Sequence, residues 1–279
     1  MVNVSEICQF LEELAPLSLA ESWDNVGLLL GRTGTEVHTL MTCLTLTERV
    51  AREAIRRDVQ LIVVHHPVLF RGVKKITDAA AEGRMVLDLV EAGIAVYSPH
   101  TALDSAATGI NQQLAEALGL QDIRALRELG PGNVAGSGRK GSYTEPVGRE
   151  DFLARVSRVT AARFLEISWN GPDEVRQVGV ACGSAAEWMN DAADAGCDTF
   201  ITGEARFHAV LDSQSRRLNL VLTGHFASER PAVEWLADRI TREFPGVNGF
   251  ASTEDPDPLE LWSNANQKST SPDKIVRKA

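Results

Sequence analysis

The spacing of apolar residues predicts strands that alternate with amphipathic helices in the first half of the chain. Apolar positions at helical spacing predict a helix over Val4–Leu17, with Ser5 as its candidate N-cap. Strands are expected at Val37–Leu46, Gln60–His65 and Ile94–Tyr97, and helices at Thr47–Arg57, Thr77–Ala92 and Ile110–Leu118. Such alternation is typical of an α/β fold with a largely parallel sheet.

The second half of the chain repeats this alternation. Strands are expected at Phe164–Ser168, Val175–Ala181, Asp198–Ile201 and Leu218–Leu222, and helices at Arg149–Ala162, Ala186–Ala195 and Pro231–Thr241. A stretch rich in Gly, Pro and Ser at Arg127–Arg139 predicts a boundary between the halves. We therefore hypothesise two similar α/β domains that arose by duplication, residues 1–128 and 129–262, followed by a polar tail at 263–279.

Two adjacent histidines follow the most apolar of these strands. Leu61–Val64 predicts a strand buried on both faces, His65 and His66 come next, and Pro67 ends the strand. Ligands of parallel α/β sheets usually bind beyond the carboxyl ends of the strands. Because successive side chains on a strand point to opposite faces, the two imidazoles could hold two different ions, or one ion and one neighbouring group. A buried, hydrogen-bonded histidine beside a surface histidine is the structural alternative.

The same arrangement recurs at two later strand ends, where a histidine precedes a carboxylate by four residues. The candidates for metal ligands are thus His65, His66, His100, Asp104, His225 and Glu229. Imidazoles and carboxylates are ligands of first-row metals such as Zn, Mn or Fe, whereas calcium and magnesium prefer shells of oxygen alone. Six candidates exceed one tetrahedral site but suit two ions, which a carboxylate can bridge.

Three further features have both a functional and a structural interpretation. Glu204 and His208 are expected on one face of a helix, where an exposed ion pair would explain them equally well. Lys74 and Lys75 lie in a basic loop that could meet an anionic substrate or only face solvent. The Trp-Asp-Asn turn within Glu21–Gly31 could line a pocket, or it could be a capped loop that its tryptophan packs onto the protein.

Composition and charge narrow the classes of function. A net charge of −10 and a pI near 5.2 disfavour nucleic-acid binding, since an acidic surface repels phosphate backbones. No apolar stretch approaches the ~20 residues needed to cross a bilayer, and the N-terminus has no signal-peptide pattern. The four cysteines include no Cys-x-x-Cys pair and indicate a reducing compartment, so we expect a cytoplasmic protein with no membrane partner.

Several motifs, which lie along nearly the whole chain except the tail, together resemble the motifs of one known protein family. They are His65-His66-Pro67, His100-Thr101-Ala102-Leu103-Asp104 with Gly109 and Asn111, Gly224-His225-Phe226-Ala227-Ser228-Glu229, Trp23–Gly27, Gly136–Arg139, and Thr202-Gly203-Glu204 through His208. This set resembles the type 2 GTP cyclohydrolase I homologue family, the Ngg-interacting-factor-three-like or YbgI-like group. Glu204 departs from the usual Asp of that family, and Cys182–Ala185 replaces a turn richer in glycine.

The resemblance implies a fold of two similar α/β domains and a toroidal homohexamer with a dinuclear metal centre facing its interior. It implies that His65 and Asp104 hold one ion and that His66 and His225 hold the other. Glu229 would bridge both ions. The expected cofactors are therefore two divalent metal ions per chain.

The resemblance also makes His100 a neighbour of the ions rather than a ligand. We expect a metal-dependent hydrolase acting on a nucleotide-like or phosphate-bearing small molecule, in which Glu204 or His100 transfers a proton. Arg139, Lys74 or Lys75 would meet the phosphate. The alternative is a non-catalytic metal-binding factor that regulates or binds a partner, which fits the lack of a clear nucleophile beyond the ligands.

Overall fold

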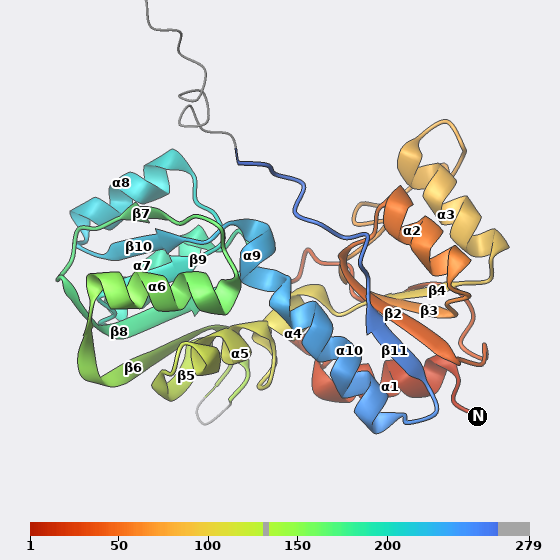
Figure 1. Cartoon of the computed structure of the whole chain (residues 1–279), viewed down its shortest axis with the longest axis horizontal. Coiled ribbons are helices and arrows are strands. Elements are labelled where there is room, and N and C mark those ends of the chain that lie inside the picture. The colour runs from red at the N-terminus through yellow and green to blue at the C-terminus, as the bar shows by residue number, and fades with distance from the viewer. Residues whose placement is uncertain (131–133, 262–279) are drawn as a thin grey trace, which may run out of the picture.

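Two mixed β-sheets, set apart along the long axis of the molecule, form the framework of the computed structural model (Figure 1), which describes residues 1–130 and 134–261. The first sheet has the order β1 (Gly27–Leu30), β4 (Ala95–Ser98), β3 (Leu61–His66), β2 (Thr39–Thr45), β11 (Asn248–Ala251). The second has the order β5 (Gln121–Glu128), β6 (Gly136–Gly148), β8 (Glu174–Ala181), β9 (Thr199–Thr202), β10 (Asn219–Leu222), β7 (Glu166–Ser168). The predicted α/β class is confirmed, and the predicted tail at 263–279 lies outside the described residues.

Helices cover both faces of each sheet. They are α1 (Val4–Leu14), α2 (Glu48–Arg56), α3 (Ala81–Glu91), α4 (His100–Ser105), α5 (Ile110–Ala117), α6 (Arg149–Thr160), α7 (Met189–Asp194), α8 (Phe207–Ser215), α9 (His225–Glu229) and α10 (Pro231–Glu243). In the first sheet, Leu61 and Val63 pack towards α1 and α10, while Ile62 and Val64 pack towards α2 and α3. This alternation confirms the prediction of a strand buried on both faces. In the second sheet, α5 and α6 lie on one face and α7 and α8 on the other.

Four strands of each sheet share one topology. Strands β2, β3 and β4 are parallel neighbours, and β1, which precedes them in the chain, pairs antiparallel with β4. Strands β8, β9 and β10 repeat this pattern, with β7 antiparallel to β10. In each unit the last parallel strand leads into a short helix, α4 or α9, in the space between the sheets (Figure 1). The two similar units expected from the sequence are therefore present.

The edges of the units differ from the prediction. The sequence does not predict the hairpin of β5 and β6, and a division at residue 128 would separate these two paired strands. Strand β5 carries charged residues along most of its length and β6 is rich in glycine, so neither shows an apolar alternation. The chain also returns to the first unit, where α10 packs against the first sheet and β11 pairs with β2. Asn3, rather than Ser5, caps α1 in a capping box with Glu6.

Arg139 lies inside the fold and not at a substrate site. Its side chain has no exposed surface and donates hydrogen bonds to Gln112 and to the backbone oxygens of Gly136, Gly138 and Ala106, at 2.6–2.7 Å. Burial lowers the pKa of the guanidinium to about 10, which leaves it charged at neutral pH. The prediction that Arg139 meets a phosphate is wrong, because its donors already serve buried oxygens that join β6 to α5 and to the end of α4.

None of the helices in the described part of the chain combines the length and the apolar character that a bilayer span requires.

We predict that Arg139→Ala destabilises the protein by at least about 3 kcal/mol, because several buried carbonyl oxygens lose a charged donor. Urea unfolding of both proteins measures the difference. Arg124→Ala, an exposed arginine of the same hairpin, is the control, and its effect should stay within about 0.5 kcal/mol. A stable Arg139→Ala protein would contradict the interior role.

Candidate metal centre

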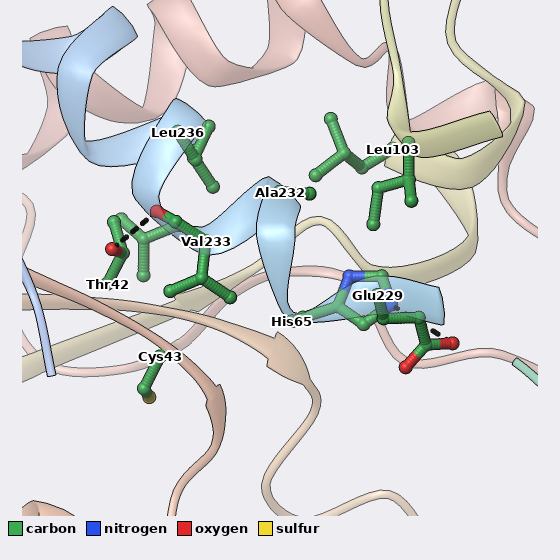
Figure 2. Close-up of a pocket in the computed structure, with 10 residues that line it drawn as sticks. Thr42, Cys43, His65, Leu103, Glu229, Ala232, Val233 and Leu236 are labelled. Carbon is green, nitrogen blue, oxygen red and sulfur yellow. Dashed lines mark hydrogen bonds and ion pairs between the residues drawn. The ribbon is translucent and has the colours of Figure 1, made fainter. Parts of the chain in front are cut away.

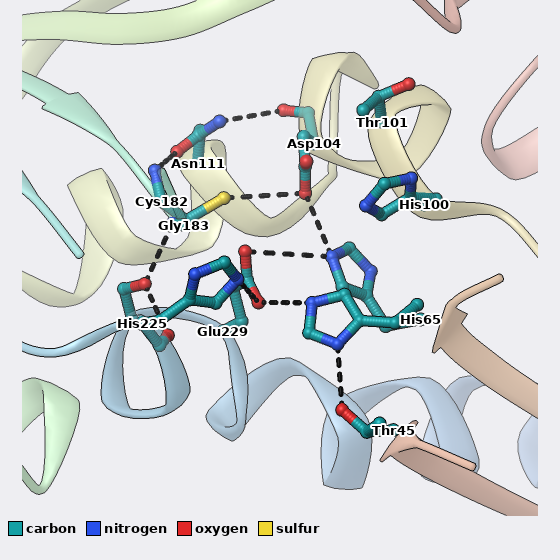
Figure 3. A network of polar contacts seen from close by, with 12 residues as sticks. Thr45, His65, His100, Thr101, Asp104, Asn111, Cys182, Gly183, His225 and Glu229 are labelled. Carbon is teal, nitrogen blue, oxygen red and sulfur yellow. Dashed lines mark hydrogen bonds and ion pairs between the residues drawn. The ribbon is translucent and has the colours of Figure 1, made fainter. Parts of the chain in front are cut away.

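Five of the predicted ligands converge between the two sheets, and Figure 3 shows His65, Asp104, His225 and Glu229 among them. They are His65 and His66 at the end of β3, Asp104 on α4, and His225 and Glu229 on α9. The carboxyl ends of β3, β4 and β10 all point into this space, and the short helices α4 and α9 start directly after their strands. The chain therefore brings together residues from both units, as parallel α/β sheets do at their ligand sites.

Glu229 lies at the middle of the cluster. Its Oε2 atom is 3.0 Å from His66 Nε2 and 3.2 Å from His225 Nε2. Its Oε1 atom is 3.9 Å from Nε2 of His65, which in turn lies 3.7 Å from Oδ1 of Asp104. The two oxygens of one buried carboxylate thus face two different pairs of candidate ligands.

His65 has unmet bonding capacity in this cluster. Its side chain is buried, and neither ring nitrogen has a hydrogen-bond partner among the residues that the structure describes. Burial lowers its pKa to about 3, so the imidazole is neutral and keeps a free lone pair. An unpaired polar atom is costly in the interior. A cation between His65 and its carboxylate neighbours would remove that cost, so the donor set fits a metal.

Behind His65 the site is closed and apolar. A pocket of about 10 Å³ adjoins His65 and Glu229 and is walled mainly by aliphatic side chains such as Leu103, Val233 and Leu236 (Figure 2). Its volume is at the lower limit for one water molecule, and its wall offers few polar partners. His65 therefore faces the cluster on one side and a mainly apolar wall on the other.

Charge in the cluster is balanced by protons in the absence of metal. Burial would raise the pKa of Glu229, but hydrogen bonds from His225 and His66 hold it well below its usual range. The hydrogen bond to Glu229 raises the pKa of His225 to about 9, despite burial. Burial and the neighbouring Glu229 charge raise the pKa of Asp104 to about 7. A cation entering the cluster would displace these protons.

Two side chains fix the orientation of His66 and His225, the two partly exposed histidines among these five candidate ligands. Thr45 Oγ1 lies 2.8 Å from Nδ1 of His66, and Glu204 Oε1 lies 3.0 Å from Nδ1 of His225. Each hydrogen bond leaves Nε2 of the ring facing Glu229. Partners of this kind set the tautomer and direction of metal-binding histidines.

The turn after β8 closes the cluster from the second unit. The Cys182 thiol donates to Asp104 Oδ1 at 3.4 Å, and Asn111 bonds to the backbone of both residues. Gly183 has a φ of +65°, and a Cβ there would collide with Glu229 Oε1. The small residue at this position makes room for the central carboxylate.

Glu204 occupies a different place from the one its spacing predicted. Helix α8 begins at Phe207, so Glu204 and His208 do not share a helix face. Glu204 instead follows β9 and contacts His225 from an exposed position. The prediction of a helical pair was wrong because Arg206, with an extended backbone, caps the start of α8.

His100 borders the cluster, and its ring centroid lies 5.2 Å from that of His65 and 5.7 Å from that of His66. Its Nδ1 atom lies 2.8 Å from Oδ1 of Asp24, whose side chain is fully buried. Burial would raise the pKa of Asp24, but hydrogen bonds from His100 and Thr101 lower it to about 2. The Trp-Asp-Asn turn, left open by the sequence, therefore belongs to the site.

An open cleft of about 1060 Å³ leads away from the exposed side of the cluster. His66, His225 and Glu204 are among its lining residues, together with residues 159–164, 230–231 and 256–260. A small molecule could reach the ligands from this side. Lys74 and Lys75 are exposed on the loop between β3 and α3, and the described residues give neither of them a contact with the cluster.

The fold and site define an α/β protein of two similar units with a cluster of candidate metal ligands between them. The model of the Duf34/NIF3 (NGG1p interacting factor 3) family matches residues 2–258, and the chain belongs to this family. This confirms the resemblance seen in the motifs.

Relatives match over most of their length. The chain is 29% identical to a "GTP cyclohydrolase 1 type 2 homolog" of Clostridium perfringens, covering 93% of this chain and all of the relative. It is 33% identical to "Protein NIF3 homolog" of Schizosaccharomyces pombe, over 91% and 96% of the two chains. Among solved structures, Staphylococcus aureus protein SA1388 has a TM-score of 0.84 at 24% identity, covering 94% of this chain and 99% of that one. A Bacillus cereus protein related to NIF3 gives 0.83 at 22% identity, with the same coverage.

We predict that metal affinity rises with pH. His225 is protonated below a pKa of about 9 in the metal-free protein, so binding through its ring must expel a proton, and Asp104 adds a second below about 7. Affinity for Zn²⁺ should fall about tenfold per pH unit for each displaced proton as pH drops from 9 to 6. Competition with a chelator across this range measures it. An affinity independent of pH would contradict the role of these groups.

We predict that Thr45→Val weakens metal binding by about 10- to 100-fold, because it keeps the shape of the side chain but removes the bond that orients His66. Isothermal titration with Mn²⁺ or Zn²⁺ gives the affinity. Thr144→Val, at an exposed position of β6, is the matched control and should bind like the wild type. Equal affinities for both variants would show that His66 needs no such support.

Proposed function

We propose that this protein binds two divalent metal ions per chain and hydrolyses a nucleotide-like or phosphate-bearing small molecule. One observation carries the proposal: the two oxygens of Glu229 face different candidate pairs, His66 with His225 and His65 with Asp104. A carboxylate so placed can bridge two ions. The mixture of imidazole and carboxylate suits Zn, Mn or Fe. The name of the Clostridium perfringens relative supports a nucleotide-like substrate.

Such ions, when bound, polarise a substrate oxygen and supply hydroxide near neutral pH. The residues of the chain would add binding and proton transfer. Glu204 lines the cleft beside His225 and can accept or return a proton there. His100, held by Asp24, can do the same at the other side of the cluster. Lys74 and Lys75 would attract an anionic substrate.

A second proposal is a metal-binding factor without catalysis, which regulates or binds a partner. One observation favours this second proposal: the nucleophilic side chains nearest the cluster already form hydrogen bonds with other groups of the protein. Ser228 Oγ donates to the backbone oxygen of His225 and accepts from the N–H of Gly183. The Cys182 thiol bonds to Asp104, and burial raises its pKa well above the usual value, so it is not a thiolate.

Assembly and location rest on the resemblance and composition. We propose a toroidal homohexamer in the cytoplasm. Light scattering on the purified full chain measures the molar mass, and a monomer would overturn the hexamer.

The test of the hydrolase is turnover by metal-loaded protein of a panel of nucleotides and phosphate esters. We expect at least one substrate to be hydrolysed, and His66→Ala should lose more than about 100-fold of the rate because it removes a ligand. His208→Ala, an exposed histidine outside the cluster, should keep full activity. A protein that retains metal but hydrolyses nothing in the panel would favour the non-catalytic factor.

A further inference from the structure

Two large aromatic side chains are exposed beside the candidate metal centre. Trp23 is 58% exposed and Phe70 is 45% exposed. Their ring centroids are 5.9 Å apart, with an interplanar angle of 69°. Edge-to-face packing of this kind leaves flat aromatic surface open to solvent. The two side chains come from different loops, before β1 and after β3, and together they form an aromatic pair.

The imidazole of His100 lies near both the aromatic pair and the candidate metal ligands. His100 lies 6.2 Å from Trp23 and 6.4 Å from Phe70, measured between ring centroids. The same imidazole is 5.2 Å from that of His65. A ligand lying on the aromatic pair would therefore extend past His100 to the cluster.

The backbone that carries the pair is held in place. Asp24, next to Trp23, accepts hydrogen bonds from His100 and from the backbone and hydroxyl of Thr101. The Asn25 side chain donates to the backbone oxygen of Leu69, at 3.0 Å, and so ties one aromatic loop to the other.

Leu69 also has a φ of +55°, which is uncommon for a residue with a side chain. It directly precedes Phe70. Such conformations persist where the surroundings enforce them, and they gather at ligand sites. The exposure of Phe70 thus follows from a held backbone and not from a loose loop.

Three basic residues follow Phe70 closely in the sequence. Arg71, Lys74 and Lys75 follow Phe70 in the same loop and are exposed, and none of the three has an ion pair among the described residues. In a protein of net charge −10, unpaired basic residues in the same loop as Phe70 favour a ligand that joins a flat ring to an anionic group.

We propose that Trp23 and Phe70 form a subsite for a planar heteroaromatic ring, such as a nucleobase, whose attached anionic group reaches the metal centre. This inference rests on the proposed function for the phosphate end of the ligand. The ring end rests on the aromatic pair alone. Stacking on an aromatic side chain tolerates any base, since every base has a flat face, so the subsite would select for a ring rather than for one base.

The experiment measures binding to manganese-loaded full-length protein by equilibrium dialysis. The probes are the four common ribonucleoside monophosphates, ribose 5-phosphate, which lacks the ring, and adenosine, which lacks the phosphate. We expect the nucleotides to bind roughly 5- to 100-fold tighter than ribose 5-phosphate, as stacking of one base implies.

Variants assign this difference to the pair. Trp23→Ala should bring nucleotide binding down to the level of ribose 5-phosphate, Phe70→Ala should lower it partly, and Trp23→Phe should keep most of it. Phe207→Ala is the matched control, because Phe207 is 71% exposed but lies on α8, and it should bind like the wild type.

The outcomes separate this inference from the proposed function. If adenosine bound in a way that depends on Trp23 and ribose 5-phosphate did not bind, the ring subsite would stand. The proposal of a phosphate-bearing substrate would then be overturned. Equal binding of nucleotides and ribose 5-phosphate would overturn the ring subsite and leave the phosphate site standing. A Trp23→Ala protein with unchanged nucleotide affinity would also overturn the ring subsite. If light scattering showed that this variant differs from the wild type only in its molar mass, the ring subsite would be overturned as well, because the aromatic pair would then be a contact between copies of this chain.

Discussion

The site depends on one buried carboxylate among imidazoles. A charge such as that of Glu229 is costly in the interior unless partners surround it, and His66 and His225 supply those partners at 3.0 and 3.2 Å. The same arrangement leaves His65 neutral and unpaired on the opposite oxygen. Histidine N–H groups therefore satisfy one oxygen of Glu229, whereas His65 lacks a hydrogen-bond partner among the described residues, a place that a cation could take. This incompleteness, rather than the number of histidines, points to metal.

The fold produces the cluster by placing two similar units face to face. Each unit ends its parallel strands towards the other, and each contributes a short helix that begins within a residue or two of its strand. Neither unit holds the full set of ligands. Buried contacts between the units, such as that of Arg139 with the backbone of Ala106, keep the two half-sites in register.

The sequence predicts which candidate ligands come together better than it predicts the residues that contact them. His65 and His66 could be placed because an aliphatic run and a proline define the end of a strand. The motifs already included Asn111 and the Trp-Asp-Asn turn, but the contacts of Thr45, Asn111 and Asp24 could not be predicted, because they join positions 21 to 76 residues apart and leave no local pattern. Likewise, β5 and β6 carry no apolar alternation, and Arg139 looks like any surface arginine until its strand is paired.

The measurement that tests the account most directly is the metal content of the purified protein after loading and removal of excess ion. We expect two ions per chain in the wild type, and loss of both in Glu229→Gln, since the central carboxylate faces both pairs of ligands. Glu234→Gln, which changes an exposed carboxylate of α10 five residues further along the chain, should keep both ions. A wild-type protein that holds no metal, or a Glu229→Gln protein that keeps its full content, would contradict the central claim.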